Sequence, residues 1–206
     1  MTAELGIICL VLALLVSLAQ SAYLFGNLDN ILAASMPRAA WLQALLVTLS
    51  LASLILLRVE SDFSIQNVAS HSNLHLPLLY KIVGTWGNHE GSMLLWLWVL
   101  SLFGALIVMS TDTNPSLIRS TNAVQAILVA GVITFILFTS NPFDRIFPPP
   151  PDGKALNPLL QDIGLAMHPP LLYLGYVGFS IVFSLSVASL LTTQGGREWG
   201  KIAHPW

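Results

Sequence analysis

The chain has 206 residues, of which 55% are hydrophobic and only 9% are charged, with a formal net charge of −2 and a mean hydropathy of +0.75. Soluble domains carry about 25% charged residues, so this composition indicates an integral membrane protein. The slightly negative charge argues against nucleic-acid binding, because no basic surface is available to neutralise phosphates.

Five apolar runs each approach the roughly 20 residues that cross a hydrocarbon layer about 30 Å thick. In chain order they cover 5–25, 39–57, 92–109, 121–139 and 171–191. None contains Asp, Glu, Lys or Arg, as expected where a charge at mid-membrane costs about 2.5–3.5 kcal/mol. We therefore predict an all-α, polytopic membrane protein whose residues 1–206 form a single membrane domain with five transmembrane helices.

Two long loops, 58–91 and 140–170, separate the second span from the third and the fourth from the fifth. Helical spacing of apolar residues over 76–86 and the helix-start pair Asn157-Pro158 predict short interfacial helices in these loops. The basic residues are denser near the span ends if the N-terminus lies outside. We expect the N-terminus and both loops outside and the C-terminus inside, so that labels at Asn67 and Gly153 react from outside and one at Gln194 does not.

Several metal or covalent cofactor sites find no support in the sequence. Cys9 is the only cysteine, so the chain has no Cys-x-x-Cys-His site for covalent heme and is not a c-type cytochrome. His89-Glu90 lacks the second histidine of a zinc protease motif, because Met93 stands in its place. His71 and His75 are interpreted as solvated loop residues, since turn-forming residues surround them.

His168 is the most informative residue, because it lies between a predicted short helix and the pair Pro169-Pro170, which is expected to form the first turn of the next helix. A residue before proline avoids the helical region, so we expect a sharp corner with the imidazole projecting at a membrane surface. Two interpretations remain open: a histidine bonded to a nearby carbonyl, or a ligand of a bound group.

Other residues of the outer loops are candidates for contacts with a bound cofactor. Arg145 and Lys154 are placed to meet carboxylates of a ligand, although exposed basic residues are commonly just solvated. Trp86 and Tyr173 fit an interfacial aromatic belt, with stacking on a cofactor as the alternative.

Three segments resemble the N-terminal part of the CcmF/NrfE family of cytochrome c-type biogenesis proteins. They are Thr85 to Trp96, Ile136 to Phe143 and, above all, Leu156 to Ser180 with its His-Pro-Pro-Leu-Leu-Tyr motif. The resemblance covers essentially the whole chain and ends before the family's tryptophan-rich segment. It implies an inner-membrane protein of bacteria, or of mitochondria if organellar, that presents heme at the outer face.

The resemblance also implies a cofactor, a site and partners. The cofactor is b-type heme delivered by a CcmE-like chaperone, His168 is an axial ligand of its iron, and the second axial ligand lies outside this chain. Trp86, Tyr173, Arg145 and Lys154 are the expected surroundings. Expected partners are a CcmH-like thiol subunit, the remaining part of the CcmF-like protein, apocytochrome c and membrane lipid.

The expected role is that of a subunit of a heme-lyase complex, in which heme is joined covalently to apocytochrome c. This chain alone is not expected to be catalytic. The alternative is a non-catalytic membrane scaffold that anchors the heme-handling subunits, and that alternative predicts no heme binding at the outer face.

Overall fold

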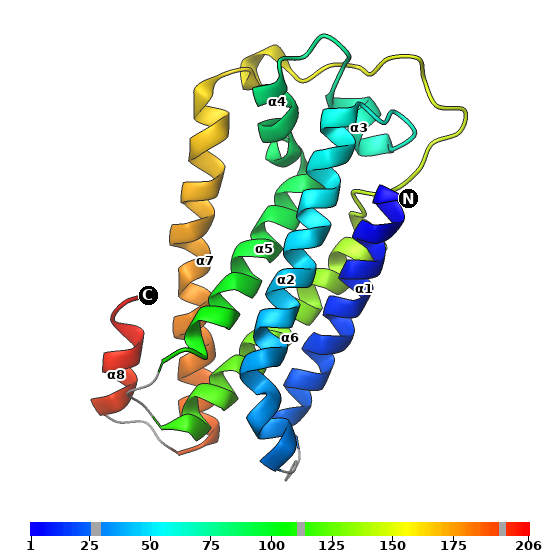
Figure 1. Ribbon diagram of the computed structural model, residues 1–206. Coiled ribbons are helices and arrows are strands. Elements are labelled where there is room, and N and C mark those ends of the chain that lie inside the picture. The colour runs from blue at the N-terminus through cyan, green and yellow to red at the C-terminus, as the bar shows by residue number, and fades with distance from the viewer. Residues whose placement is uncertain (26–29, 111–113, 194–196) are drawn as a thin grey trace.

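The computed structural model describes residues 1–25, 30–110, 114–193 and 197–206, with side chains omitted at 30–33 and 197–198 as well (Figure 1). Five of its helices are long and apolar enough to cross a membrane, which confirms the predicted all-α fold. These helices are α1 (Thr2–Ser21, continued by the 3-10 turn Ala22–Leu24), α2 (Asn30–Glu60), α5 (His89–Ile107), α6 (Pro115–Thr139) and α7 (Ile163–Leu191). The spans are longer than the apolar runs because capping residues and polar end turns extend them.

The long helices run up and down, so that both long loops gather at one end of the bundle beside the N-terminus (Figure 1). We call this the loop end, and the opposite end, which carries α8 (Arg197–Ala203), the tail end. The loop end carries the short elements α3 (Gln66–His71), α4 (Leu78–Val83), and the 3-10 turns Gly84–Trp86 and Pro158–Leu160. The predicted short helices are therefore present in both loops.

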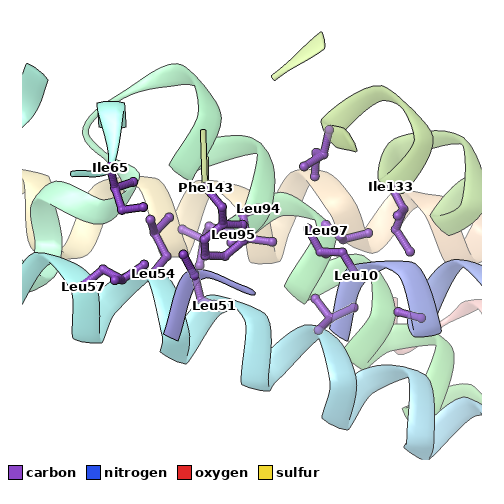
Figure 2. Packing of buried hydrophobic residues seen from close by; sticks show 14 of the residues in the cluster. Leu10, Leu51, Leu54, Leu57, Ile65, Leu94, Leu95, Leu97, Ile133 and Phe143 are labelled. Atoms are coloured by element: carbon purple, nitrogen blue, oxygen red, sulfur yellow. The ribbon is translucent and has the colours of Figure 1, made fainter. Parts of the chain in front are cut away.

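The bundle core is apolar and continues up into the loop end. α1 packs between α2 and α6, while α5 contacts α2, α6 and α7. Figure 2 shows Phe143, from the second loop, lying among Leu51, Leu94 and Leu95. Phe143 fits there because Gly6 has no side chain, since a Cβ at that position would overlap the phenyl ring. The second loop thereby closes one end of the core.

Polar side chains link the helices inside the bundle. Gln20 on α1 donates to Asn122 on α6 at 2.9 Å, and Asn122 donates to the Gly104 carbonyl on α5 at 2.9 Å. Gln125 donates to Ser180 at 2.9 Å and accepts from Ser184 at 2.8 Å, both on α7. Small and amide side chains of this kind hold transmembrane helices together where lipid offers no hydrogen bonds.

The structure corrects four expectations about the loops. Helix α2 continues to Glu60, so the first loop begins after Glu60 rather than at Arg58, and α7 begins at Ile163 rather than at Pro169-Pro170. His168 does not lie at a corner, because α7 runs through Pro169 and Pro170 without ending. Thr85, which helical spacing over 76–86 would place on a different face from Trp86, is fully buried.

Candidate functional site

A groove of about 390 Å³ lies at the loop end, where the second loop turns into α7. Its lining is mainly apolar and combines the turn at Pro158–Leu160 with the start of α7. The lining residues are Leu159, Leu160, Asp162, Gly164, Leu165, His168 and Pro169. His168 is exposed at this groove, so its imidazole is accessible.

Two capping side chains fix the course of the chain into this groove. Asn157 accepts from the Leu159 N–H at 3.0 Å and starts the 3-10 turn, as the sequence predicts. Asp162 accepts from the Gly164 N–H at 2.6 Å and is the N-cap of α7. A helix that begins at Ile163 carries His168 in its second turn, and Asp162 before an apolar run was the signal that could have predicted this start.

The four histidines of the loop end differ in what they contact. The Nδ1 of His71 lies 3.1 Å from the Asn67 carbonyl, and Nε2 of His89 lies 3.0 Å from the Ser140 hydroxyl. Within the described ranges, the rings of His75 and His168 have no hydrogen-bond partner and both residues are exposed. Of the two free rings, His168 is the one that lines the groove. The carbonyl-bonded interpretation of His168 is therefore not what the structure shows.

The other predicted site residues lie at different distances from this groove. Trp86 is close, because its indole Nε1 donates to the Leu165 carbonyl at 2.8 Å. Tyr173 is half-buried against the bundle core. Arg145 is bound to Glu4 and Ser64, and Lys154 is exposed next to α3, where its backbone N–H donates to Ala69. Neither basic residue lines the groove.

Sequence reasoning did not find Arg58, the most unusual side chain at the loop end. Its exposed fraction is 0%, and none of its guanidinium nitrogens has a hydrogen-bond partner. It lies under Gly84 and Leu156, because a Cβ built at Gly84 would lie 3.8 Å from its Nη1 and 3.7 Å from Leu156 Cδ2. Among the described residues, Glu90 is the acidic group whose charge favours the charged form of Arg58. The sequence gives no signal of this burial, because Leu156, one of the two residues that cover Arg58, comes from the other loop.

No other arrangement among the described side chains suggests direct metal binding. In those ranges, no three His, Cys, Asp or Glu side chains lie close enough together to hold a metal ion. The groove offers one imidazole and an apolar wall, which suits a group that brings its own metal in a flat apolar frame.

The fold and the groove together define a polytopic membrane protein with an accessible histidine at the loop end. The family model described as cytochrome c assembly protein matches residues 86–203, which include the whole of the groove. This chain belongs to that family, and within it to the CcmF/NrfE/CycK group of cytochrome c-type biogenesis proteins.

Individual relatives agree over the full chain. It is 49% identical to cytochrome c-type biogenesis protein CycK of Bradyrhizobium diazoefficiens and 41% identical to CcmF of Escherichia coli, with 100% of this chain covered in each case. These matches cover 32% and 33% of the relatives. A solved structure of cytochrome c heme lyase CcmF superimposes with a TM-score of 0.83 at 25% identity, over 100% of this chain and 33% of that one. The chain thus spans about a third of the length of its relatives.

Proposed function

We propose that this chain forms the part of a heme-lyase complex that presents heme at the outer membrane face, with His168 as one axial ligand. The observation that carries the proposal is the free, exposed imidazole of His168 at an apolar groove, in a chain of the CcmF family. The E. coli relative is named for cytochrome c-type biogenesis and the solved structure for heme lyase activity.

The residues of the groove fit part of a heme. Neutral imidazole is a common axial ligand of heme iron, and Leu159, Leu160 and Leu165 provide an apolar surface for one face of the macrocycle. The charged edge of heme has no basic partner in the groove, where the only charged side chain is Asp162. We infer that the partners for the propionates lie outside the groove and that the second axial ligand comes from outside this chain.

The remaining assignments follow from family membership and the arrangement of the loops. The N-terminus and the loop end face outward, in the inner membrane of bacteria or the corresponding organellar membrane. A CcmE-like chaperone delivers heme, a CcmH-like subunit handles the thiols, and apocytochrome c accepts the heme. The other two thirds of a CcmF-like protein complete the site.

A hemin titration of the purified chain tests the ligand assignment. His168→Ala is compared with His75→Ala, because both rings are exposed and free while only His168 lines the groove. We expect the parent and His75→Ala to shift the Soret band of hemin and His168→Ala to lose that shift. Identical spectra for all three proteins would remove His168 from the site.

A scaffold role is the second candidate, and one observation favours it. An apolar groove of about 440 Å³ lies between α5, α6 and α7, lined among others by Trp96, Tyr176 and Phe183, of which Tyr176 and Phe183 are exposed. Such a surface suits packing against further membrane segments. Under this role the chain would assemble with the rest of the protein equally well with or without His168.

A further inference from the structure

Helix α7 lacks the backbone N–H donors of Pro169 and Pro170, and a side chain from the first loop takes the place of the one missing at Pro169. Pro169 has no backbone N–H, so the Leu165 carbonyl lacks the donor that would normally come from four residues further along. The indole Nε1 of Trp86 donates to this same carbonyl oxygen at 2.8 Å, from 79 residues away in the sequence. The bond joins the first loop to the turn of α7 that carries His168.

We propose that Trp86 is a positioning residue for His168: its indole N–H replaces the N–H missing at Pro169 and holds the His168 turn in place. His168 lies between Leu165, whose carbonyl lacks its donor within the helix, and Pro169, which lacks the N–H. Leu165 and His168 also line the same groove, so a shift of this turn moves both the imidazole and the apolar wall. The proposal rests on the proposed function in taking His168 as the heme ligand.

The segment that carries Trp86 is itself held firmly. Asn88 donates to the carbonyls of Gly84 and Thr85 at 3.1 and 3.2 Å, and it accepts from the Gly91 N–H at 2.9 Å. The 3-10 turn Gly84–Trp86 is thus fixed to the start of α5. The backbone that carries the indole is therefore held by bonds that do not involve α7.

Close packing next to the indole supports the same link. A Cβ at Gly87 would lie 3.5 Å from Leu165 Cδ2 and 3.5 Å from Leu156 Cδ1, so the backbone next to Trp86 lies close to side chains of α7 and of the second loop. Trp86 is half-buried and packs against the bundle core. The hydrogen bond consequently lies where water competes poorly for the carbonyl.

A rescue experiment tests the proposal directly, because the donor lost at Trp86 can be replaced by a backbone N–H at position 169. Trp86→Phe keeps an aromatic ring but removes the donor, whereas Pro169→Ala restores a backbone N–H that can bond to the Leu165 carbonyl within α7. We expect Trp86→Phe to release hemin about tenfold faster than the parent, equivalent to about 1.4 kcal/mol. The double variant Trp86→Phe/Pro169→Ala should return to within about twofold of the parent, since the carbonyl is again satisfied.

Trp98→Phe is the matched control. Trp98 Nε1 also donates to another helix, to Thr48 Oγ1 at 2.9 Å, but it has no contact with α7 in the groove. Its loss should lower thermal stability without altering hemin release. Equal hemin release in Trp86→Phe and Trp98→Phe, or no rescue by Pro169→Ala, overturns the proposal. If Trp86→Phe alone does not fold, the proposal requires that the double variant Trp86→Phe/Pro169→Ala folds and releases hemin like the parent. A double variant that does not fold, or that releases hemin faster, also overturns the proposal.

A readout without heme separates this proposal from the ligand assignment. Diethyl pyrocarbonate modifies exposed imidazoles, and mass spectrometry of the peptide gives the rate of modification at His168. This rate reports the surroundings of the His168 ring directly. Trp86→Phe should change this rate, and Pro169→Ala should restore it. Should hemin binding prove independent of His168, the ligand assignment fails while the modification rates still decide the role of Trp86.

Discussion

Arg145 is bound to Glu4: its guanidinium donates to the carboxylate through Nε at 3.1 Å and also through Nη2. A third donor, Nη1, bonds the Ser64 hydroxyl at 2.9 Å. These contacts join the second loop to the first turn of α1 and to the segment before α3. Arg145 is therefore bound to the first turn of α1, whereas His168 lies in α7, and the N-terminus and α7 lie on opposite sides of the bundle (Figure 1).

Arg145→Ala should leave the fold intact. Both partners of the ion pair are about half exposed, and an exposed pair contributes little to stability because water and salt screen it. We expect a small decrease in melting temperature at low ionic strength that disappears in high salt. A large, salt-independent loss would show that the pair is required for folding.

The expectation that Arg145 and Lys154 meet heme propionates stays a prediction. It requires Arg145 to exchange Glu4 for a propionate, a charge-assisted bond of similar kind. The double variant Arg145→Ala/Lys154→Ala should then release hemin faster than the parent at an unchanged melting temperature. Equal release rates at matched protein concentration would exclude both residues from the site.

The orientation of the bundle can be tested with single cysteines at exposed positions. Asn67 is buried, and a side chain at Gly153 would overlap the Ser72 carbonyl, while Gln194 lies outside the described residues. Better positions are Leu74, which is 54% exposed, and Phe147, which is 96% exposed, at the loop end. Gly200 in α8 serves for the tail end, because nothing lies within 4 Å of a Cβ there.

With the loop end outside, an impermeant thiol reagent should label Leu74→Cys and Phe147→Cys in intact cells. Gly200→Cys should react only after the membrane is permeabilised. The parent serves as the control, because Cys9 is buried. Labelling of Gly200→Cys alone in intact cells would invert the orientation.

The features that the sequence predicted correctly depend on local signals. Apolar runs located the five spans, and Asn157-Pro158 located the 3-10 turn, because a cap and the turn it starts are neighbours in the chain. The start of α7 was predicted wrongly, and the reason is not local. Pro169 and Pro170 predicted the start of a helix, whereas the helix already begins after its N-cap Asp162. It continues through the prolines, and Trp86, remote in sequence, donates to the carbonyl that Pro169 leaves without a donor.

Burial at the loop end was equally hard to predict. A single continuous helix over 76–86 would place Thr85 away from Trp86, but the structure changes from α-helix to a 3-10 turn at Gly84, and Thr85 becomes buried. The burial of Arg58 depends on Leu156, which comes from the other loop. Contacts between segments this far apart leave no periodic pattern in a single sequence.

Gly91→Ala should destabilise the protein strongly. Gly91 lies in the first turn of α5, and a Cβ there would overlap the Thr85 carbonyl, which is backbone and cannot move aside as a flexible side chain can. Overpacking of this kind typically costs about 1–3 kcal/mol. Gly131→Ala on α6 is the matched control, since nothing lies within 4 Å of its Cβ and alanine favours a helix by up to about 1 kcal/mol. Similar melting temperatures for the two variants would contradict the close approach at Gly91.

Arg58→Met should stabilise the isolated chain. The guanidinium is fully buried and has no hydrogen bond, and removing an ion from water costs several kcal/mol unless partners compensate it. Methionine keeps much of the apolar volume under Leu156 without the charge, so we expect a gain of about 1–4 kcal/mol, within the range seen when apolar residues replace buried ions.

Arg38→Met is the control for that experiment, because Arg38 lies on the same helix and is exposed. Its effect should stay within about 0.5 kcal/mol. Thermal unfolding of both variants in the same detergent measures the difference. If Arg58→Met is less stable than the parent while Arg38→Met is unchanged, the guanidinium is satisfied in solution by bridging water, and the charge of Arg58 then supports the loop end together with Glu90.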